Sequence, residues 1–179
     1  WKNINDQIWI VGSTSSESTI GASSYLEYFH GLVTGRPPKI NLQDEKFCQS
    51  FLREAILKNY IISSHDVSDG GLAITLSECC ILSSKGATIE LEEHNIRKDS
   101  LLFSEGGSRI IFSLNKKEEL KFLDFVNYKR KDFPQNIYVK KIGFVTKENF
   151  QITFENEVLC NLRVDELTKK FNNGISSRF

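Results

Sequence analysis

The stretch that decides the fold runs from residue 61 to residue 73 and reads Ile61-Ile62-Ser63-Ser64-His65-Asp66-Val67-Ser68-Asp69-Gly70-Gly71-Leu72-Ala73. Its two isoleucines bring the chain out of the core as a short strand, and the leucine after the glycine pair opens a helix with an apolar face. The segment therefore predicts a strand-to-helix junction, in which residues 65–71 form the turn.

This turn carries two carboxylates, one hydroxyl and one imidazole before its two glycines. Adjacent glycines let a backbone approach a ligand closely, and the helix start that follows favours anions. Because Asp66 and Asp69 would repel a bare phosphate, they predict a magnesium ion between themselves and the phosphate. We interpret these two as metal ligands and the other positions as facing a nucleotide or phosphate, namely His65, Ser68, Gly70 and Gly71. The alternative is that Ser68 and Asp69 only cap the helix, with His65 a hydrogen-bonded edge residue.

A second glycine loop lies further along the chain, Phe103-Ser104-Glu105-Gly106-Gly107-Ser108-Arg109. Its amides and the Ser108 hydroxyl can cradle an anion, while Glu105 can orient an amine or a metal-bound water. We interpret five positions here as facing nucleotide or phosphate, namely Glu105, Gly106, Gly107, Ser108 and Arg109. The alternative is an ordinary Gly-Gly turn in which Arg109 pairs with Glu105.

A third segment, Gly21-Ala22-Ser23-Ser24-Tyr25-Leu26, places small residues before an aromatic helix. It either packs against a neighbouring domain, lines a nucleotide pocket, or is a serine N-cap followed by core aromatics. His30 and His94 are expected at the surface. No nucleophile–His–Asp arrangement stands out, and no residue is assigned a catalytic role.

Strand and helix patterns alternate along the chain. Strands are predicted over residues 8–11, 60–62, 87–92, 109–114, 138–145 and 150–154. Helices are predicted over 25–29, 42–59 with Asn41 as N-cap, 72 to about 86, 116–128 and about 164–171. The helix over 42–59 is expected to face the core with Phe47, Phe51, Ala55 and Ile56. The helix over 116–128 is expected to do so with Leu120, Leu123 and Val126. The pattern indicates an α/β (α+β) domain, with a mixed sheet covered by helices.

The composition narrows the function classes. Lysine plus arginine equals aspartate plus glutamate, at 23 each, and aromatic residues fall at core-type spacing, so neither nucleic acid nor a membrane is an expected partner. The four cysteines lack metal-type spacing, and the apolar content argues against a disulfide framework, which favours a reduced, cytoplasmic protein. The chain has no methionine and opens on a strand-like run. We expect a single domain, residues 1–179, cut from a longer protein, with a motif-bearing core over about 6–160 and a tail over 172–179.

The run from His65 to Ala73, with Glu78 and Glu105…Ser108-Arg109 after it, closely resembles the phosphoribosylformylglycinamidine synthase family. The similarity is to its C-terminal domain, which is of the aminoimidazole-ribonucleotide-synthetase C-terminal type. Further pieces stand in the family's order: Asp6-Gln7-Ile8-Trp9-Ile10-Val11-Gly12, Gly21-Ala22-Ser23-Ser24-Tyr25-Leu26, Gly35-Arg36-Pro37-Pro38, Leu42 with Glu45, and Leu102-Phe103. Together they span roughly residues 6–114.

The resemblance implies an ATP-dependent ligase of purine biosynthesis that turns formylglycinamide ribonucleotide, ATP and glutamine-derived ammonia into the amidine, ADP and phosphate. It implies ATP and Mg²⁺ as cofactors. The implied partners are the other domains of the same polypeptide, a glutaminase subunit or domain, a small accessory subunit and the ribonucleotide substrate. In the family's first half the aspartate matching Asp66 binds magnesium, and the loop matching 105–107 contacts substrate. Second-half copies, which this chain resembles, are often structural or belong to an auxiliary nucleotide site, and the isolated domain is expected to be inactive.

The chain departs from the family pattern in two places. Glu-Ser-Gln-Ser-Arg is usual where this chain has Glu105-Gly106-Gly107-Ser108-Arg109, and Ser-Glu-Tyr-Leu where it has Ser23-Ser24-Tyr25-Leu26. The first change leaves only backbone donors at 106 and 107. One alternative is therefore a structural packing module of the same enzyme. Another is a relative such as thiamine-monophosphate kinase or selenide water dikinase, although the segments around Tyr25-Leu26 and 102–109 argue against these.

Overall fold

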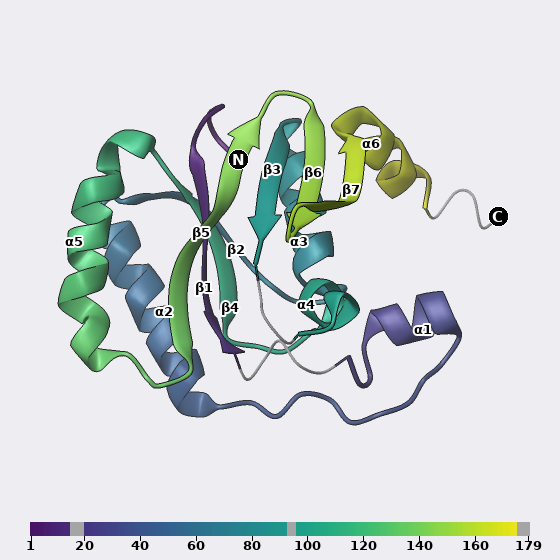
Figure 1. Ribbon diagram of the computed structural model, residues 1–179, viewed down its shortest axis with the longest axis horizontal. Coiled ribbons are helices and arrows are strands. Elements are labelled where there is room, and N and C mark those ends of the chain that lie inside the picture. The colour runs from purple at the N-terminus through teal and green to yellow at the C-terminus, as the bar shows by residue number, and fades with distance from the viewer. Residues whose placement is uncertain (15–19, 93–95, 175–179) are drawn as a thin grey trace.

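The computed structural model describes residues 1–14, 20–92 and 96–174, so His94 and the end of the predicted tail lie outside the described residues. One mixed sheet runs through the described part of the chain, with helices around it (Figure 1). Its strands are β1 (Gln7–Ser13), β2 (Ile61–Asp66), β3 (Gly86–Leu91), β4 (Arg109–Leu114), β5 (Ile137–Thr146), β6 (Asn149–Phe154) and β7 (Glu157–Arg163). The helices are α1 (Ser24–His30), α2 (Leu42–Leu57), α3 (Gly71–Ser83), α4 (Lys98–Phe103), α5 (Glu119–Lys129) and α6 (Val164–Asn173), with short 3₁₀ helices η2 (Lys116–Glu118) and η3 (Arg130–Asp132).

The strand order across the sheet is β2-β4-β1-β5-β3-β6-β7. Neighbouring strands pair antiparallel except β3 and β6, which pair parallel. This confirms the predicted α/β (α+β) class, a mixed sheet covered by helices. Strand β4 pairs with both β1 and β2. The C-terminal ends of β1 and β2 therefore lie beside the N-terminal end of β4, at one end of the sheet.

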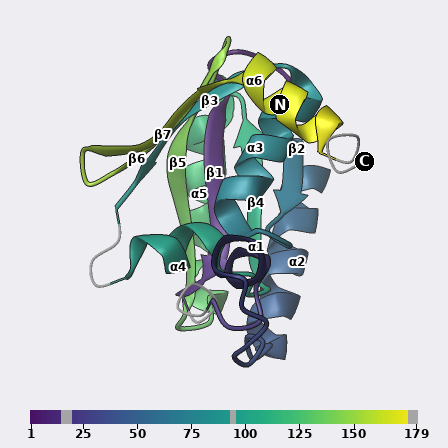
Figure 2. The same ribbon diagram turned by 90° about the vertical axis from the view of Figure 1, so that its right-hand side faces the viewer.

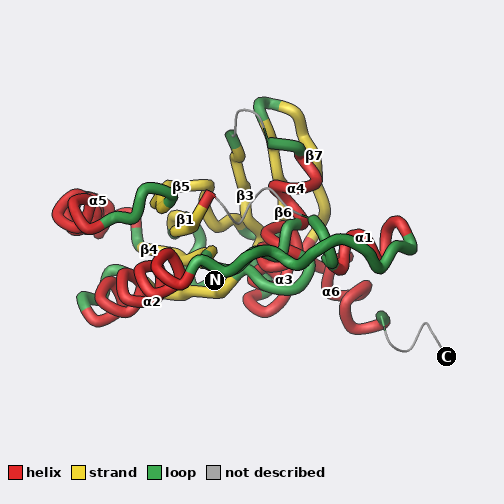
Figure 3. The backbone as a smooth tube through the Cα atoms, turned by 90° about the horizontal axis from the view of Figure 1, so that it is seen from below, coloured by secondary structure: helices red, strands yellow, loops and turns green. Residues whose placement is uncertain are grey.

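Strand β1 is buried along its whole length. Ile8 and Ile10 belong to a core cluster with residues of α3, β3 and β6, whereas Trp9 and Val11 belong to a second cluster with residues of α2 and α5. Seen from below, α2 and α5 lie beside β1 and β4, while α3 and α6 lie toward β6 (Figure 3). Alternate side chains of one central strand therefore join two cores, as the period of two in a strand allows.

The predicted helices are present, but two side chains that were predicted to face the core are exposed. Asn41 caps α2 as predicted and accepts hydrogen bonds from the amides of Gln43 and Asp44. Ile56 is exposed, because the buried stripe of this helix runs through Asp44, Cys48, Phe51 and Ala55. Leu120 is 77% exposed, because the buried stripe of α5 consists of Phe122, Phe125 and Val126. In both helices an apolar residue beside the buried stripe is exposed to solvent, since only one side of the helix faces the core.

One predicted boundary also changes, and two elements were not predicted. Strand β2 continues through Asp66, so His65 and Asp66 belong to the strand and not to the turn, and the strand is a half-exposed sheet edge rather than buried. Helix α4 and strand β7 were missed. Strand β7 lies at the other edge of the sheet, where no residue is fully buried, so its sequence shows little apolar alternation. Within the described helices, none combines the length and apolarity needed to cross a bilayer.

Candidate functional site

The three segments singled out from the sequence meet at one end of the sheet. Strand β4 runs antiparallel to β1 and β2, so Gly12 pairs with Arg109 and Asp66 pairs with Ile110. The amide of Val67 donates to the Arg109 carbonyl at 2.9 Å, which continues this pairing into the turn. The second glycine loop therefore lies beside the first turn, although some 40 residues of sequence separate them.

Glu105 joins all three segments. One oxygen of its carboxylate, Oε1, accepts a hydrogen bond from the amide of Gly70 at 2.7 Å and another from the amide of Ser24 at 2.9 Å. These amides belong to the starts of α3 and α1. A carboxylate near helix N-termini is favourable both as an acceptor and as a negative charge. Glu105 is thus a clamp that holds two helix starts to the loop preceding β4.

The capping alternative for Ser68 and Asp69 is wrong. The N-cap of α3 is Gly70, in the left-handed conformation with φ 77°, and its cap has no side-chain hydrogen bond. The Arg109–Glu105 pairing alternative also differs from the observed contacts: the buried guanidinium of Arg109 donates to the Ser104 carbonyl. The carboxylate that serves the start of α3 comes from a distant loop instead.

Gly71 is required by packing. It is buried at φ 70°, and a Cβ placed on it would lie 2.7 Å from backbone atoms of Phe103 and Ser104, where α4 ends. Its amide donates to the Ser68 carbonyl at 3.0 Å. The amides of both glycines therefore already have acceptors inside the chain, and the phosphate-facing role predicted for them stays a prediction.

The acidic side chains of the junction point outward. The Asp66 side chain is 77% exposed, and Asp69 and Ser68 are exposed as well. His65 lies between its neighbours, with Nδ1 2.8 Å from the Asp66 carbonyl oxygen and Nε2 3.9 Å from an Oε2 of Glu78. The side chains of Asp66, Ser68 and Asp69 are thus open to solvent.

The junction fits a metal only as half of a site. Among the described residues, no group of three or more His, Cys, Asp or Glu side chains could hold a metal ion. Mg²⁺, however, is commonly held by one or two carboxylates together with the phosphates of a nucleotide and water. Two exposed aspartates on one junction match that pattern, and do not match a resident metal enclosed by protein ligands.

Ser108 contacts the first turn of α2. Its backbone has a positive φ of 59°, and its hydroxyl donates to Glu45 Oε2 at 2.8 Å. The Ser13 amide donates to the Ser108 carbonyl at 3.0 Å, and the Ser13 hydroxyl donates to the buried carboxylate of Asp44 at 2.6 Å. Sequence reasoning gave neither acidic residue a place in the site. The signals were their position in the first turn of a helix after an Asn N-cap and, for Glu45, its place among the pieces that stand in the family's order.

The remaining predicted positions of this loop differ in environment. Gly106 is buried and Gly107 is exposed. A Cβ on Gly107 would meet only Glu45 Oε2, at an ordinary 3.6 Å, so a side chain fits there. Cys48, next to this loop, donates to the Ser108 carbonyl, and burial raises the pKa of its thiol to about 12. It is therefore an inert thiol rather than a nucleophile.

Helix α1 lies beside the clamp with its aromatic side chains largely outside. Ser23 is its N-cap, as the sequence suggested, and accepts from the Leu26 amide. The core-aromatic alternative is wrong, because α1 has no buried residue. Tyr25 stacks on Phe103 with ring centroids 4.6 Å apart. A cavity of about 230 Å³ lies between α1 and the start of α3, lined by Ser24, Tyr25, Tyr28, Phe29, Gly70, Ile74 and Phe103.

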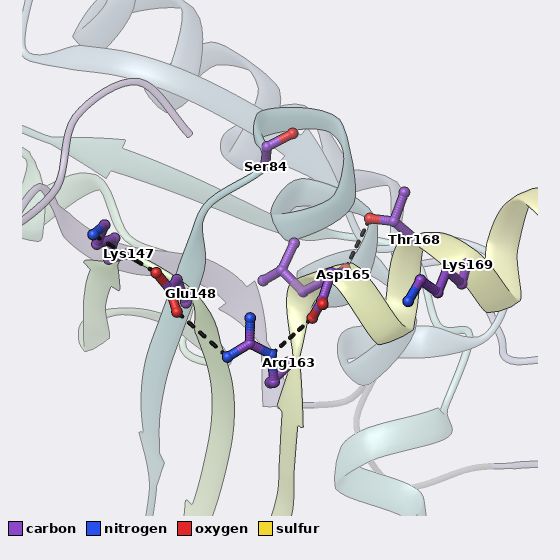
Figure 4. A pocket seen from close by; sticks show the side chains of 8 residues that line it. Ser84, Lys147, Glu148, Arg163, Asp165, Thr168 and Lys169 are labelled. Atoms are coloured by element: carbon purple, nitrogen blue, oxygen red, sulfur yellow. Dashed lines mark hydrogen bonds and ion pairs between the residues drawn. The ribbon is translucent and has the colours of Figure 1, made fainter.

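A second hollow, of about 410 Å³, lies at the start of α6 (Figure 4). Its charged side chains pair with one another: Arg163 contacts Glu148 at 3.5 Å and Asp165 at 3.0 Å. It contains none of the residues predicted from the sequence. These ion pairs are exposed, and the hollow contains one more cation than carboxylates; exposed charges of this kind give a ligand little specific affinity.

Known proteins share this sequence and fold. Residues 3–153 match the family described as AIR synthase related protein, C-terminal domain. Phosphoribosylformylglycinamidine synthase subunit PurL of Prochlorococcus marinus strain MED4 is 74% identical over 179 residues, which are all of this chain and 23% of that protein. The same subunit of strain MIT 9313 is 38% identical over 186 aligned residues, again 23% of its length. The chain thus spans about a quarter of these relatives.

Solved structures show the same fold at low identity. The T. maritima PurL complexed with ATP has a TM-score of 0.69 at 16% identity, covering 94% of this chain and 26% of that one. E. coli HypE, a hydrogenase maturation protein, has a TM-score of 0.55 at 12% identity, covering 90% and 50%. Identities this low establish a common architecture and leave the chemistry to be argued from the residues.

Proposed function

The chain belongs to the family of AIR synthase related proteins, C-terminal domain, and on this premise we propose that residues 1–179 are the single C-terminal domain of a phosphoribosylformylglycinamidine synthase. The observation that carries the proposal is the 74% identity, over the whole chain, to a subunit with that name. The aligned stretch covers the whole chain, and so includes both cores and the junction and not a motif alone.

The proposed parent is an ATP-dependent carbon–nitrogen ligase of purine biosynthesis in the cytoplasm. It converts formylglycinamide ribonucleotide, ATP and glutamine-derived ammonia to formylglycinamidine ribonucleotide, ADP and phosphate. Its proposed partners are the remaining domains of its own polypeptide, a glutaminase and a small accessory subunit. A solved structure with this fold is described as PurLQS from Thermotoga maritima, which supports an assembly of this kind.

Within that ligase we assign Asp66 and Asp69 to a magnesium–nucleotide complex and assign no catalytic residue. Mg²⁺ supplies charge neutralisation to the phosphates that it binds. The exposed Asp66 and Asp69 carboxylates would hold the ion together with the phosphates, and His65 and Ser68 are the neighbouring residues of the same junction. Glu105 holds the starts of α1 and α3 in place through its hydrogen bonds with the Ser24 and Gly70 amides. Loop residues Gly106, Gly107, Ser108 and Arg109 keep the nucleotide- or phosphate-facing role that the sequence predicts for them.

A chimeric enzyme tests the proposal. The 179-residue segment of the P. marinus MED4 subunit that matches this chain is replaced by this chain, and formation of the amidine is measured with ATP and ammonia. We expect the chimera to keep most of the parent activity, since the exchanged segments share 74% of their residues. A chimera that folds and assembles but makes no amidine contradicts the proposed function, as does amidine synthesis by the isolated chain.

A second candidate, favoured by one observation, is a packing module without a ligand. The amides of Gly70 and Gly71 are used inside the chain, as expected for a structural junction. The double variant Asp66→Ala, Asp69→Ala in the active chimera separates the candidates. Loss of magnesium-dependent nucleotide binding supports the nucleotide-facing role, whereas unchanged binding and unchanged activity support the packing role.

A further inference from the structure

The surface around α1 is unusually apolar. Six large apolar or aromatic side chains between residues 28 and 42 are at least half exposed, namely Tyr28, Phe29, Leu32, Val33, Ile40 and Leu42. We call this set the α1 strip. Figure 2 shows α1 at the near face of the molecule, and in Figure 1 the segment that follows it runs along one edge to α2. Exposed apolar side chains concentrated on one short segment of chain in this way favour an interaction site.

The α1 strip is held in a defined shape. Its helix is tied to the body by the Ser24–Glu105 hydrogen bond and by the stacking of Tyr25 on Phe103. The segment after α1 returns to the residues that precede α1, where the Ala22 amide donates to the Thr34 carbonyl at 2.8 Å. Gly21 is packed so closely on the Arg36 backbone that a Cβ would lie 2.6 Å from its carbonyl oxygen. A surface ordered in advance loses little conformational entropy on binding.

We propose that the α1 strip is the surface on which another domain of the same ligase docks, an inference that rests on the proposed function. The curated relatives are about four times as long as the stretch that matches this chain, so they contain ample further polypeptide to cover it. The cavity of about 230 Å³ between α1 and α3 takes an apolar anchor side chain of that domain. The strip is longer than a small ligand needs.

Charge argues against a second copy of this chain as the occupant. Between residues 28 and 42 the sequence contains Arg36 and Lys39 and no carboxylate. In a two-fold symmetric contact this positively charged segment would meet the same positively charged segment of the other copy, whereas a different domain can present carboxylates to it. The docked domain therefore combines apolar anchors with an acidic rim.

The Lys39–Ile40 peptide bond reports whether the strip is covered. Both residues are exposed and lie outside any helix or strand, which makes the bond a good trypsin site in the uncovered domain. In the intact, active chimeric ligase we expect this bond to resist trypsin. The Val33 side chain is 86% exposed in the domain. The substitution Val33→Asp removes its apolar contact with the docked domain, so cleavage after Lys39 should become about tenfold faster or more.

The matched control is Leu120→Asp, because Leu120 is 77% exposed but lies on α5, away from the strip. It should leave the cleavage rate at Lys39 unchanged. Rapid cleavage at Lys39 in the wild-type ligase while it makes amidine overturns the docking proposal and leaves the proposed function standing. An inactive chimera, by contrast, overturns the proposed function itself.

Two other occupants give distinct results. If Val33→Asp halves the mass of the ligase particle in solution, the strip holds a second copy, and the proposal is wrong. If the wild-type ligase sediments with vesicles of phosphatidylserine and phosphatidylcholine and Val33→Asp abolishes this, the occupant is a membrane surface, and the proposal is again wrong. An unchanged mass and no sedimentation, together with protected Lys39, support the docked domain.

Discussion

The start of α3 and the start of α6 are both helix N-termini whose N-cap residue gives no side-chain hydrogen bond, yet they are stabilised in different ways. At α3 the Glu105 carboxylate arrives from a loop 35 residues away and serves Gly70 and Ser24 together. At α6 the Val164 amide donates to the Glu148 carbonyl, and Arg163 pairs with exposed carboxylates around it.

The difference lies in how much structure depends on each contact. The Glu105 clamp connects three segments, and removing it leaves amides at two helix starts without their acceptor. The ion pairs at α6 connect exposed side chains, whose partners water can replace. A shared local pattern, an uncapped helix start beside charges, therefore has large consequences at one place and small ones at the other. Four variants test this contrast.

The largest effect is expected for Gly71→Ala. The new Cβ would lie 2.7 Å from the backbone of Phe103 and Ser104, at a φ of 70° that alanine disfavours. We expect the free energy of unfolding to fall by about 3 kcal/mol. Urea unfolding of the chain, followed by the fluorescence of buried Trp9, measures it. The control is Gly107→Ala, where a Cβ finds ordinary space and the change should be below about 0.5 kcal/mol. Equal effects of the two substitutions would contradict the packing account.

The next effect is expected for Glu105→Ala, which removes the shared acceptor of Gly70 and Ser24. We expect a loss of about 2 kcal/mol in the same unfolding measurement, because two amides lose a charged partner. Glu105→Gln keeps an oxygen at this position and should restore about half of the loss. The clamp account fails if Gln and Ala are equally destabilising, or if neither changes the unfolding midpoint.

A smaller effect, on binding rather than folding, is expected for Asp66→Ala with Asp69→Ala. Both side chains are exposed and carry no fold contact comparable to Glu105, so the unfolding midpoint should stay nearly constant. In the full ligase we expect the affinity for magnesium–nucleotide at this domain to fall about tenfold. Calorimetric titration with and without Mg²⁺ measures it, with Glu78→Gln as a nearby control. Identical titrations for the variant and the parent would favour the packing module.

The smallest effect is expected for Arg163→Ala at the α6 hollow. The Arg163 guanidinium holds the pKa of Asp165 below its usual value, so the pair contributes above the ordinary aspartate range and is lost as pH falls through the lowered pKa. Because both side chains are largely exposed, the unfolding midpoint at neutral pH should hardly move. The unfolding midpoints of Arg163→Ala and of the parent chain, measured at neutral and at acidic pH, test both expectations. A large change at neutral pH would show that the two helix starts are equally dependent on their charges.

Much of the fold could be predicted from the sequence. Strand 109–114 was placed at its observed bounds, and the Asn41 cap of α2 and a serine N-cap before α1 were expected from local capping chemistry. These features depend on neighbouring residues, for which sequence spacing is a direct guide. The inward faces of α2 and α5 were harder, and Ile56 and Leu120 were misplaced, because the direction of a helix face is set by what it packs against.

The candidate site was found in pieces but not assembled. The sequence singled out the segments containing Ser24, Gly70 and Glu105 without showing that one carboxylate oxygen joins them. The contributions of Asp44 and Glu45 were missed, since their partners Ser13 and Ser108 lie 31 and 63 residues away along the chain. Long-range hydrogen bonds of this kind have no sequence period, so no pattern reveals them.

By itself, then, the sequence determined the class of fold, the position of the strand-to-helix junction and the family to which the chain belongs. These follow from local propensity, hydrophobic period and a run of chemically specific residues between His65 and Ala73. Only the tertiary structure decided what the junction residues do. It placed Glu105 under the helix starts, packed Gly71 against the end of α4 and left Asp66 and Asp69 facing solvent. The physical reason is that roles at a site depend on which distant groups the sheet brings within hydrogen-bonding distance, and strand pairing settles that only when the chain folds.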